Sequence, residues 1–187
     1  MESSSSSQNA KNDETLFIVG QDENKFDGFL QSSLYQEIFC DDFLGQVPPI
    51  NLKKEKYLHD FIMKLNDYKI INSAHDISDG GLLPCMIEML LLNKLGININ
   101  LPPKIKTPNK ENLLFLHGWL FGEDQSRIII STNKPDKLMR FSKSENIKIY
   151  CIGKTNNTGV VEIPKYDSIC INKCLDLYNN TIPNLFS

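Results

Sequence analysis

The chain is poor in the residues that build disulfide frameworks and metal sites. Among its 187 residues it has three histidines and five cysteines, an odd number with no C-x-x-C pair. The cysteines are Cys40, Cys85, Cys151, Cys170 and Cys174. The last two are four residues apart and could share a helix face, but few histidines are available to complete a metal site with them. The composition argues against a disulfide framework and a zinc site, and it fits a reducing cytoplasm.

Long hydrophobic runs and a basic face are also missing. The longest apolar stretch, residues 82–92, contains Glu88 and is shorter than the roughly 20 residues that span a bilayer. The net charge is −3, and acidic residues interrupt the lysines of residues 53–64. We interpret that segment as the solvated face of a helix, with a phosphate-binding patch as the alternative. Neither a membrane nor a nucleic acid is an expected partner.

The first 13 residues contain a serine run with Asn, Lys and acidic residues, and no apolar segment. A secretory signal peptide needs an apolar segment, so we expect residues 1–13 to be a disordered leader. The remaining residues, 14–187, suit one domain, and the 41% apolar content of the chain is enough for a core.

Apolar periodicity predicts strands that alternate with helices. Strands are predicted at residues 15–20, from about 70, and at 96–101, 127–132, 147–152 and 159–163; helices are predicted at 29–39, from about 51, and at 82–92, 113–120, 135–143 and 175–178. The helix at 82–92 is apolar on more than one face and should be buried between layers. Residues 155–158 should form a hairpin turn between the last two strands, which excludes an all-parallel sheet. We therefore predict an α/β or α+β layered domain, with a mixed sheet covered by helices.

A strand-to-helix turn within residues 73–82 carries the densest group of functional residue types. Its candidate binding residues are His75, Asp76, Ser78, Asp79, Gly80 and Gly81. Paired glycines let backbone N–H groups come close to a ligand, and the N-terminus of the following helix favours an anion. The alternative is structural: Asp79 would be the N-cap of the helix, followed by an ordinary glycine turn. The pattern alone leaves both interpretations open.

Three segments, in this order, resemble the C-terminal domain of the aminoimidazole ribonucleotide (AIR) synthetase superfamily. They are residues 73–82, residues 120–127 with the acidic loop Glu123, Asp124 and Gln125, and residues 152–155. Within the superfamily the chain looks most like the phosphoribosylformylglycinamidine synthase family, because residues 32–35 and 45–52 resemble its Gly-Ser-x-Tyr and Pro-Pro-x-Asp-Leu segments and residues 177–187 resemble its natural end. The chain departs from the family at residues 30–33, where Gly-Gly-Ser is usual, and at Asn51, where Asp is usual.

The resemblance implies a fold like the PurM C-terminal domain and a part in an ATP-dependent C–N ligase of purine biosynthesis. That enzyme uses glutamine to convert formylglycinamide ribonucleotide to formylglycinamidine ribonucleotide. In the complete enzyme, N-terminal domains would supply most ligands of ATP and Mg²⁺, and a glutaminase component would be a further partner. The turn at residues 75–81 would complete the nucleotide site, and the acidic loop would contact the substrate by internal symmetry of the enzyme.

The resemblance also makes predictions about the chain alone. It has no metal cage of its own, although Asp76 and Asp79 could add one carboxylate to a site. We expect it to be inactive alone and to self-associate through an apolar face that normally packs on the missing domains. Two alternatives stay open: a domain of another ATP-using member, such as a selenophosphate synthetase, thiamine-phosphate kinase or hydrogenase maturation protein, or a non-catalytic scaffolding domain.

Overall fold

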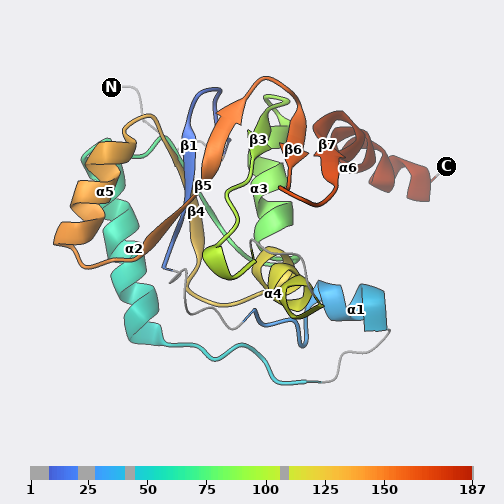
Figure 1. Cartoon of the computed structure of the whole chain (residues 1–187), viewed down its shortest axis with the longest axis horizontal. Helices are drawn as coiled ribbons and strands as arrows, with labels where there is room; N and C mark the ends of the chain where they lie inside the picture. Colours follow the sequence, from blue (N-terminus) through green and yellow to red (C-terminus); the bar gives the residue numbers. More distant parts are fainter. Residues whose placement is uncertain (1–8, 21–27, 41–44, 106–109, 187) are drawn as a thin grey trace.

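The computed structural model of the protein describes residues 9–20, 28–40, 45–105 and 110–186, and shows a mixed sheet between two helical layers (Figure 1). The strands are β1 (Thr15–Val19), β2 (Ser73–Asp76), β3 (Gly96–Asn98), β4 (Ile128–Thr132), β5 (Ile149–Asn156), β6 (Val160–Glu162) and β7 (Ser168–Cys170). The helices are α1 (Leu34–Cys40), α2 (Leu52–Asp67), α3 (Leu82–Leu91), α4 (Lys110–Phe121), α5 (Pro135–Ser144) and α6 (Ile171–Leu185), with a 3₁₀ turn η1 at Pro103–Ile105. The predicted layered α+β architecture is confirmed.

The seven strands follow the order β2-β4-β1-β5-β3-β6-β7. The first strand of the sequence is therefore in the interior of the sheet, where β1 pairs antiparallel with both β4 and β5. At one edge, β2 pairs antiparallel with β4, which carries the 73–76 segment alongside Ile128 to Ser131. This edge holds the predicted functional turn.

Alternate side chains of β1 enter two separate cores, as the two-residue period of a strand requires. Phe17 and Val19 pack with the buried face of α2 and with Leu138 of α5. Leu16 and Ile18 pack on the other face, with α3 and Trp119 of α4. The sheet is covered on both faces, and seven of the ten residues of α3 are buried, as its apolar sequence predicted.

Two helix starts show how local sequence positions the chain. Asn51 is the N-cap of α2, because its side chain accepts a hydrogen bond from the Lys54 N–H at 3.1 Å. The predicted helix from residue 29 instead begins at Leu34. There, Ser33 Oγ accepts from the Gln36 N–H at 3.3 Å, and Gln36 Oε1 accepts from the Ser32 N–H at 2.7 Å. This reciprocal arrangement resembles a capping box and fixes a later start than the apolar periodicity suggested.

The predicted hairpin between the strands now identified as β5 and β6 is wrong. The turn forms, because Asn156 Oδ1 accepts hydrogen bonds from the N–H and the hydroxyl of Thr158. However, β3 lies between the two strands, antiparallel to β5 and parallel to β6. Gly96 permits this insertion, since a Cβ there would lie 2.5 Å from Val160 O and 2.7 Å from Asn156 Oδ1. The sheet is mixed for this reason and not because of a terminal hairpin.

The two ends of the described chain also differ from expectation. Residues 1–8 of the expected leader lie outside the described residues, but residues 9–13 pack on the domain: Ala10 is buried and its N–H donates to Met89 O at 3.0 Å. At the other end, β7 was not predicted, and α6 extends well beyond the expected helix at 175–178. The expected loop at 21–28 and connector at 104–109 lie largely outside the described residues. Among the described helices, none has the length and hydropathy needed to cross a membrane.

Candidate functional site

In the glycine turn between β2 and α3, the backbone N–H groups of both glycines donate hydrogen bonds to other groups of the chain. Gly80 and Gly81 have φ values of +79° and +80°. The Gly81 N–H donates to Ser78 O at 3.0 Å, and the Gly80 N–H donates to Glu123 Oε1 at 2.8 Å. In this conformation both donors are engaged within the chain, so the two glycine N–H groups do not themselves form a phosphate cradle.

Asp79 is not the cap of α3. The N-cap is Gly81, which has no side chain to accept a hydrogen bond, and Asp79 is exposed, as are Asp76 and Ser78. The structural interpretation of Asp79 as a cap is therefore wrong. Its carboxylate instead lies at the surface of the turn, beside other polar side chains.

We expect Asp79→Ala to leave the free energy of unfolding within about 0.5 kcal/mol of wild type, because an exposed side chain without a cap bond contributes little. The matched control is Asn51→Ala, which removes a real cap and should cost about 1 kcal/mol. Urea denaturation of both variants measures the difference. A loss at Asp79 equal to that at Asn51 would restore the capping interpretation.

A hydrogen bond joins the acidic loop to the glycine turn, the two segments that contain the candidate site residues. Glu123 Oε1 accepts from the N–H groups of Gly80 (2.8 Å) and Leu34 (3.0 Å), and the Glu123 N–H donates to Phe29 O (2.9 Å). Gln125, by contrast, is exposed. Glu123 thus ties three segments that are far apart in sequence: the β2–α3 turn, the start of α1 and the loop after α4.

Asp124 holds the same loop in place through contacts to Phe29 and to the buried Arg127. Its Oδ1 accepts from the Phe29 N–H at 3.2 Å, and its Oδ2 lies 3.1 Å from Arg127 Nη1. Arg127 is buried and also donates to Gly122 O (3.0 Å) and Trp119 O (3.1 Å). Burial lowers the pKa of the Arg127 guanidinium and Asp124 opposes that shift. The guanidinium stays charged, since arginine is not deprotonated in proteins.

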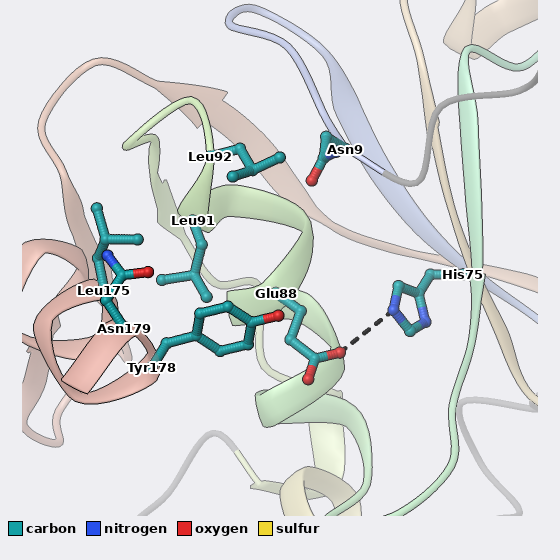
Figure 2. A pocket seen from close by; sticks show the side chains of 8 residues that line it. All are labelled: Asn9, His75, Glu88, Leu91, Leu92, Leu175, Tyr178 and Asn179. Atoms are coloured by element: carbon teal, nitrogen blue, oxygen red, sulfur yellow. Dashed lines mark ion pairs between the residues drawn. The ribbon is translucent and has the colours of Figure 1, made fainter. Parts of the chain in front are cut away.

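His75 faces away from the acidic loop, toward α3. Its Nε2 lies 3.2 Å from Glu88 Oε2 (Figure 2). Its Nδ1 lies 2.8 Å from Asp76 O and 3.3 Å from Cys85 Sγ. The Cys85 thiol donates to Asp76 O, and burial, with smaller contributions from Glu88 and Asp76, raises its pKa. A protonated, buried thiol is a poor nucleophile. The Cys85–His75–Glu88 arrangement therefore orients the imidazole and does not activate a cysteine.

A pocket of about 280 Å³ opens beside the His75–Glu88 pair (Figure 2). Its walls come from β2, α3 and α6 and from the segment before β1; they are Asn9, His75, Glu88, Leu91, Leu92, Leu175, Tyr178 and Asn179. The imidazole is mostly buried, whereas the Glu88 carboxylate is half exposed. The pocket can present one acidic and several neutral polar groups to a neighbour, against an apolar wall.

Five of the predicted site residues form two groups, whereas Asp76, Ser78, Asp79 and Gln125 are exposed and belong to neither. Gly80, Gly81, Glu123 and Asp124 belong to one hydrogen-bonded junction, and His75 belongs to the pocket on the α3 side. Sequence reasoning missed Arg127 and Glu88 as parts of these groups. Each had a visible signal: Arg127 is one of only two arginines and follows Asp124 by three residues, and Glu88 is the single charge on an apolar helix.

A metal site does not fit the described residues alone. Within residues 9–20, 28–40, 45–105 and 110–186 there is no group of three or more His, Cys, Asp or Glu side chains that could hold an ion. Asp76 and Asp79 are exposed and could add oxygen ligands only to a site completed from outside the described chain.

The sequence of the chain is similar to a known protein family and to named members of it. The family model described as AIR synthase related protein, C-terminal domain, matches residues 13–164. The phosphoribosylformylglycinamidine synthase subunit PurL of Azorhizobium caulinodans is 33% identical over 144 residues, which are 76% of this chain and 18% of that subunit. The chain thus spans less than a fifth of the length of that relative.

Solved structures show the same fold. PurL of Thermotoga maritima complexed with FGAR matches with a TM-score of 0.67 and 15% identity, over 90% of this chain and 29% of that chain. The same protein complexed with ATP matches with a TM-score of 0.65 and 14% identity, over 89% of this chain and 26% of that chain. Since the family model covers most of the sequence and includes both the glycine turn and the acidic loop, the chain belongs to the family of AIR synthase related protein C-terminal domains.

Proposed function

We propose that the chain is the C-terminal domain of a phosphoribosylformylglycinamidine synthase. In that role it takes part in the ATP- and glutamine-dependent conversion of formylglycinamide ribonucleotide to formylglycinamidine ribonucleotide. The observation that carries the proposal is the hydrogen bond from the Gly80 N–H to Glu123, which joins two of the three segments on which the resemblance rests. The 33% identity to a PurL subunit favours this member of the superfamily over its other ATP-using members.

The chain acts by completing a composite site. Its glycine donors are engaged internally and its described residues hold no metal cage, so N-terminal domains of the synthase supply most contacts to ATP and Mg²⁺. ATP contributes the phosphoryl group that activates the substrate amide. The exposed polar groups at the turn, Asp76, Ser78 and Asp79, are the part of this chain that can meet a ligand held by those domains. A glutaminase component and a cytoplasmic location complete the proposal.

Rigid positioning is the contribution of the chain itself. Glu123 and Asp124 hold the turn and the segments around it through three hydrogen bonds, from the N–H groups of Gly80, Leu34 and Phe29, and one ion pair, with Arg127. Because these contacts are made within the domain, the turn needs little reorganisation when a partner domain docks. Such preorganisation lowers the free energy lost on ordering a binding loop.

Calorimetric titration with ATP and Mg²⁺ tests the composite site. We expect no binding by the isolated chain and binding once the remaining portion of the synthase from the same organism is added. In the complete enzyme, His75→Ala and Asp79→Ala should reduce activity or nucleotide retention more than they lower the melting temperature. His59→Ala, on the exposed side of α2, is the matched control.

The outcomes separate the alternatives. Binding by the isolated chain would contradict the composite site and make the turn sufficient. Absence of binding in both samples would support a packing or scaffolding role. Unchanged activity in both variants, with a lowered melting temperature, would assign His75 and Asp79 to the fold.

A further inference from the structure

The last helix, α6, carries one apolar stripe that continues past the body of the domain. The stripe lies on one face of the helix, because its residues stand three, four, seven, eleven and fourteen positions after the first; they are Ile171, Cys174, Leu175, Tyr178, Ile182 and Leu185. Ile171 is buried, and Cys174 and Leu175 pack on the core that contains α3. From residue 176 onward every described residue is exposed. The first turns of the stripe are thus covered and the rest is not.

Beyond Asp176, the uncovered part is large and has no charged side chain. Tyr178, Ile182 and Leu185 are 69%, 67% and 75% exposed, and Phe186 is 87% exposed. Residues 177–186 include no Asp, Glu, Lys or Arg. Figure 1 shows this half of α6 extending away from the sheet. A surface of this kind suits an apolar partner, because it offers neither charge attraction nor charge repulsion.

The same residues have little intrinsic tendency to form a helix. Asn179, Asn180, Thr181 and Asn184 are weak helix formers, and Pro183 lacks the N–H needed for the helical ladder. A short helix of such composition gains its stability from packing of an apolar face and not from propensity. The sequence of α6 is therefore that of a helix formed against a surface.

The position of the stripe indicates which surface this is. Leu175 and Tyr178 line the pocket that also holds His75 and Glu88, so a partner lying on α6 also reaches that pocket (Figure 2). A PurL relative extends for more than four-fifths of its length beyond the region that this chain matches. If the proposed function holds, that remaining portion belongs to the same assembly and lies next to the proposed composite site, where α6 can meet it.

We propose that the C-terminal half of α6 is a docking arm that packs its stripe on an uncharged apolar surface of the rest of the synthase. The inference rests on the proposed function, because that function supplies the partner. The arm holds the two portions together beside the His75 pocket.

The test compares two double variants of the full chain. Ile182→Ser with Leu185→Ser removes the outer stripe, and Met63→Ser with Met139→Ser removes exposed methionines from α2 and α5, on the opposite side of the sheet (Figure 1). Calorimetry measures the Kd of each for the remaining portion of the synthase. We expect the α6 variant to bind roughly tenfold more weakly or worse, and the control to bind like wild type. Both should melt as wild type does, because the replaced side chains are exposed.

Three results would overturn the inference. Equal affinity of the α6 variant and wild type would overturn it and leave the proposed function intact. If wild type itself fails to associate, the inference and the proposed function fall together. If sedimentation shows that the isolated chain dimerises, and the α6 variant loses only that dimer, the occupant of the stripe is a second copy and not the rest of the synthase.

Discussion

Arg127→Met should lower the free energy of unfolding by roughly 3–5 kcal/mol, the range seen when one partner of a buried ion pair is removed. The replacement keeps most of the apolar stem but leaves the Asp124 carboxylate without its cation. It also leaves Gly122 O and Trp119 O without the donors that now reach them at 3.0 and 3.1 Å. Chemical denaturation followed by tryptophan fluorescence measures the loss, since Trp119 is buried beside the pair.

The matched control is Arg140→Met on α5, where the arginine is exposed. It should change stability by less than about 0.5 kcal/mol. A loss at Arg127 as small as that at Arg140 would show that the buried guanidinium is not needed to hold the acidic loop. In the complete enzyme, the Arg127 variant should also lose activity when the temperature is raised, because the junction of turn and loop opens first.

Gly81→Ala should lower the free energy of unfolding by roughly 2–4 kcal/mol. Its φ of +80° and ψ of −154° lie in a region that is essentially restricted to glycine. A Cβ would also lie 2.6 Å from the carbonyl carbon of Phe121 and 2.8 Å from Gly122 O, both backbone atoms that cannot move aside cheaply. The turn would have to separate from the α4–β4 loop, which breaks the Gly80–Glu123 contact. Thermal unfolding of the purified variant measures the effect.

Gly159→Ala separates the two causes of that loss. Gly159 also has a positive φ, +66°, but a Cβ there would meet only Lys94 O at 3.6 Å. It should therefore cost only about 1 kcal/mol, from backbone conformation alone. If both variants lose the same amount, the close approach of Gly81 to the α4–β4 loop does not contribute.

The layers of the fold could be predicted because they depend on local periodicity. The apolar residues of α3 and the alternation of Ile97, Ile99 and Leu101 identify buried faces without knowledge of the partners. Pairing between strands is not local, so the insertion of β3 between β5 and β6 was missed. The turn residues at 155–158 correctly indicated a turn, but a turn does not determine which strand lies beside the next.

The sequence indicated which segments of the chain form the candidate site, but only partly how their side chains are arranged. Glycines at 80 and 81 and carboxylates at 123 and 124 marked two segments that do meet. The direction of each side chain was not available from the pattern. His75 faces Glu88 and not the acidic loop, and the glycine N–H groups face the protein. Which donors remain for a ligand depends on contacts between distant segments, which spacing alone does not give.

The interior place of β1 has a consequence for how the chain folds. Both neighbours of β1 come late in the sequence, at residues 128–132 and 149–154. During synthesis β1 therefore stays unpaired, with its apolar side chains uncovered, until most of the domain has left the ribosome. Such distant pairings are slow to form and leave edges open to aggregation. A chaperone that holds the emerging β1 segment should raise the yield of folded protein more than one that acts on the finished chain.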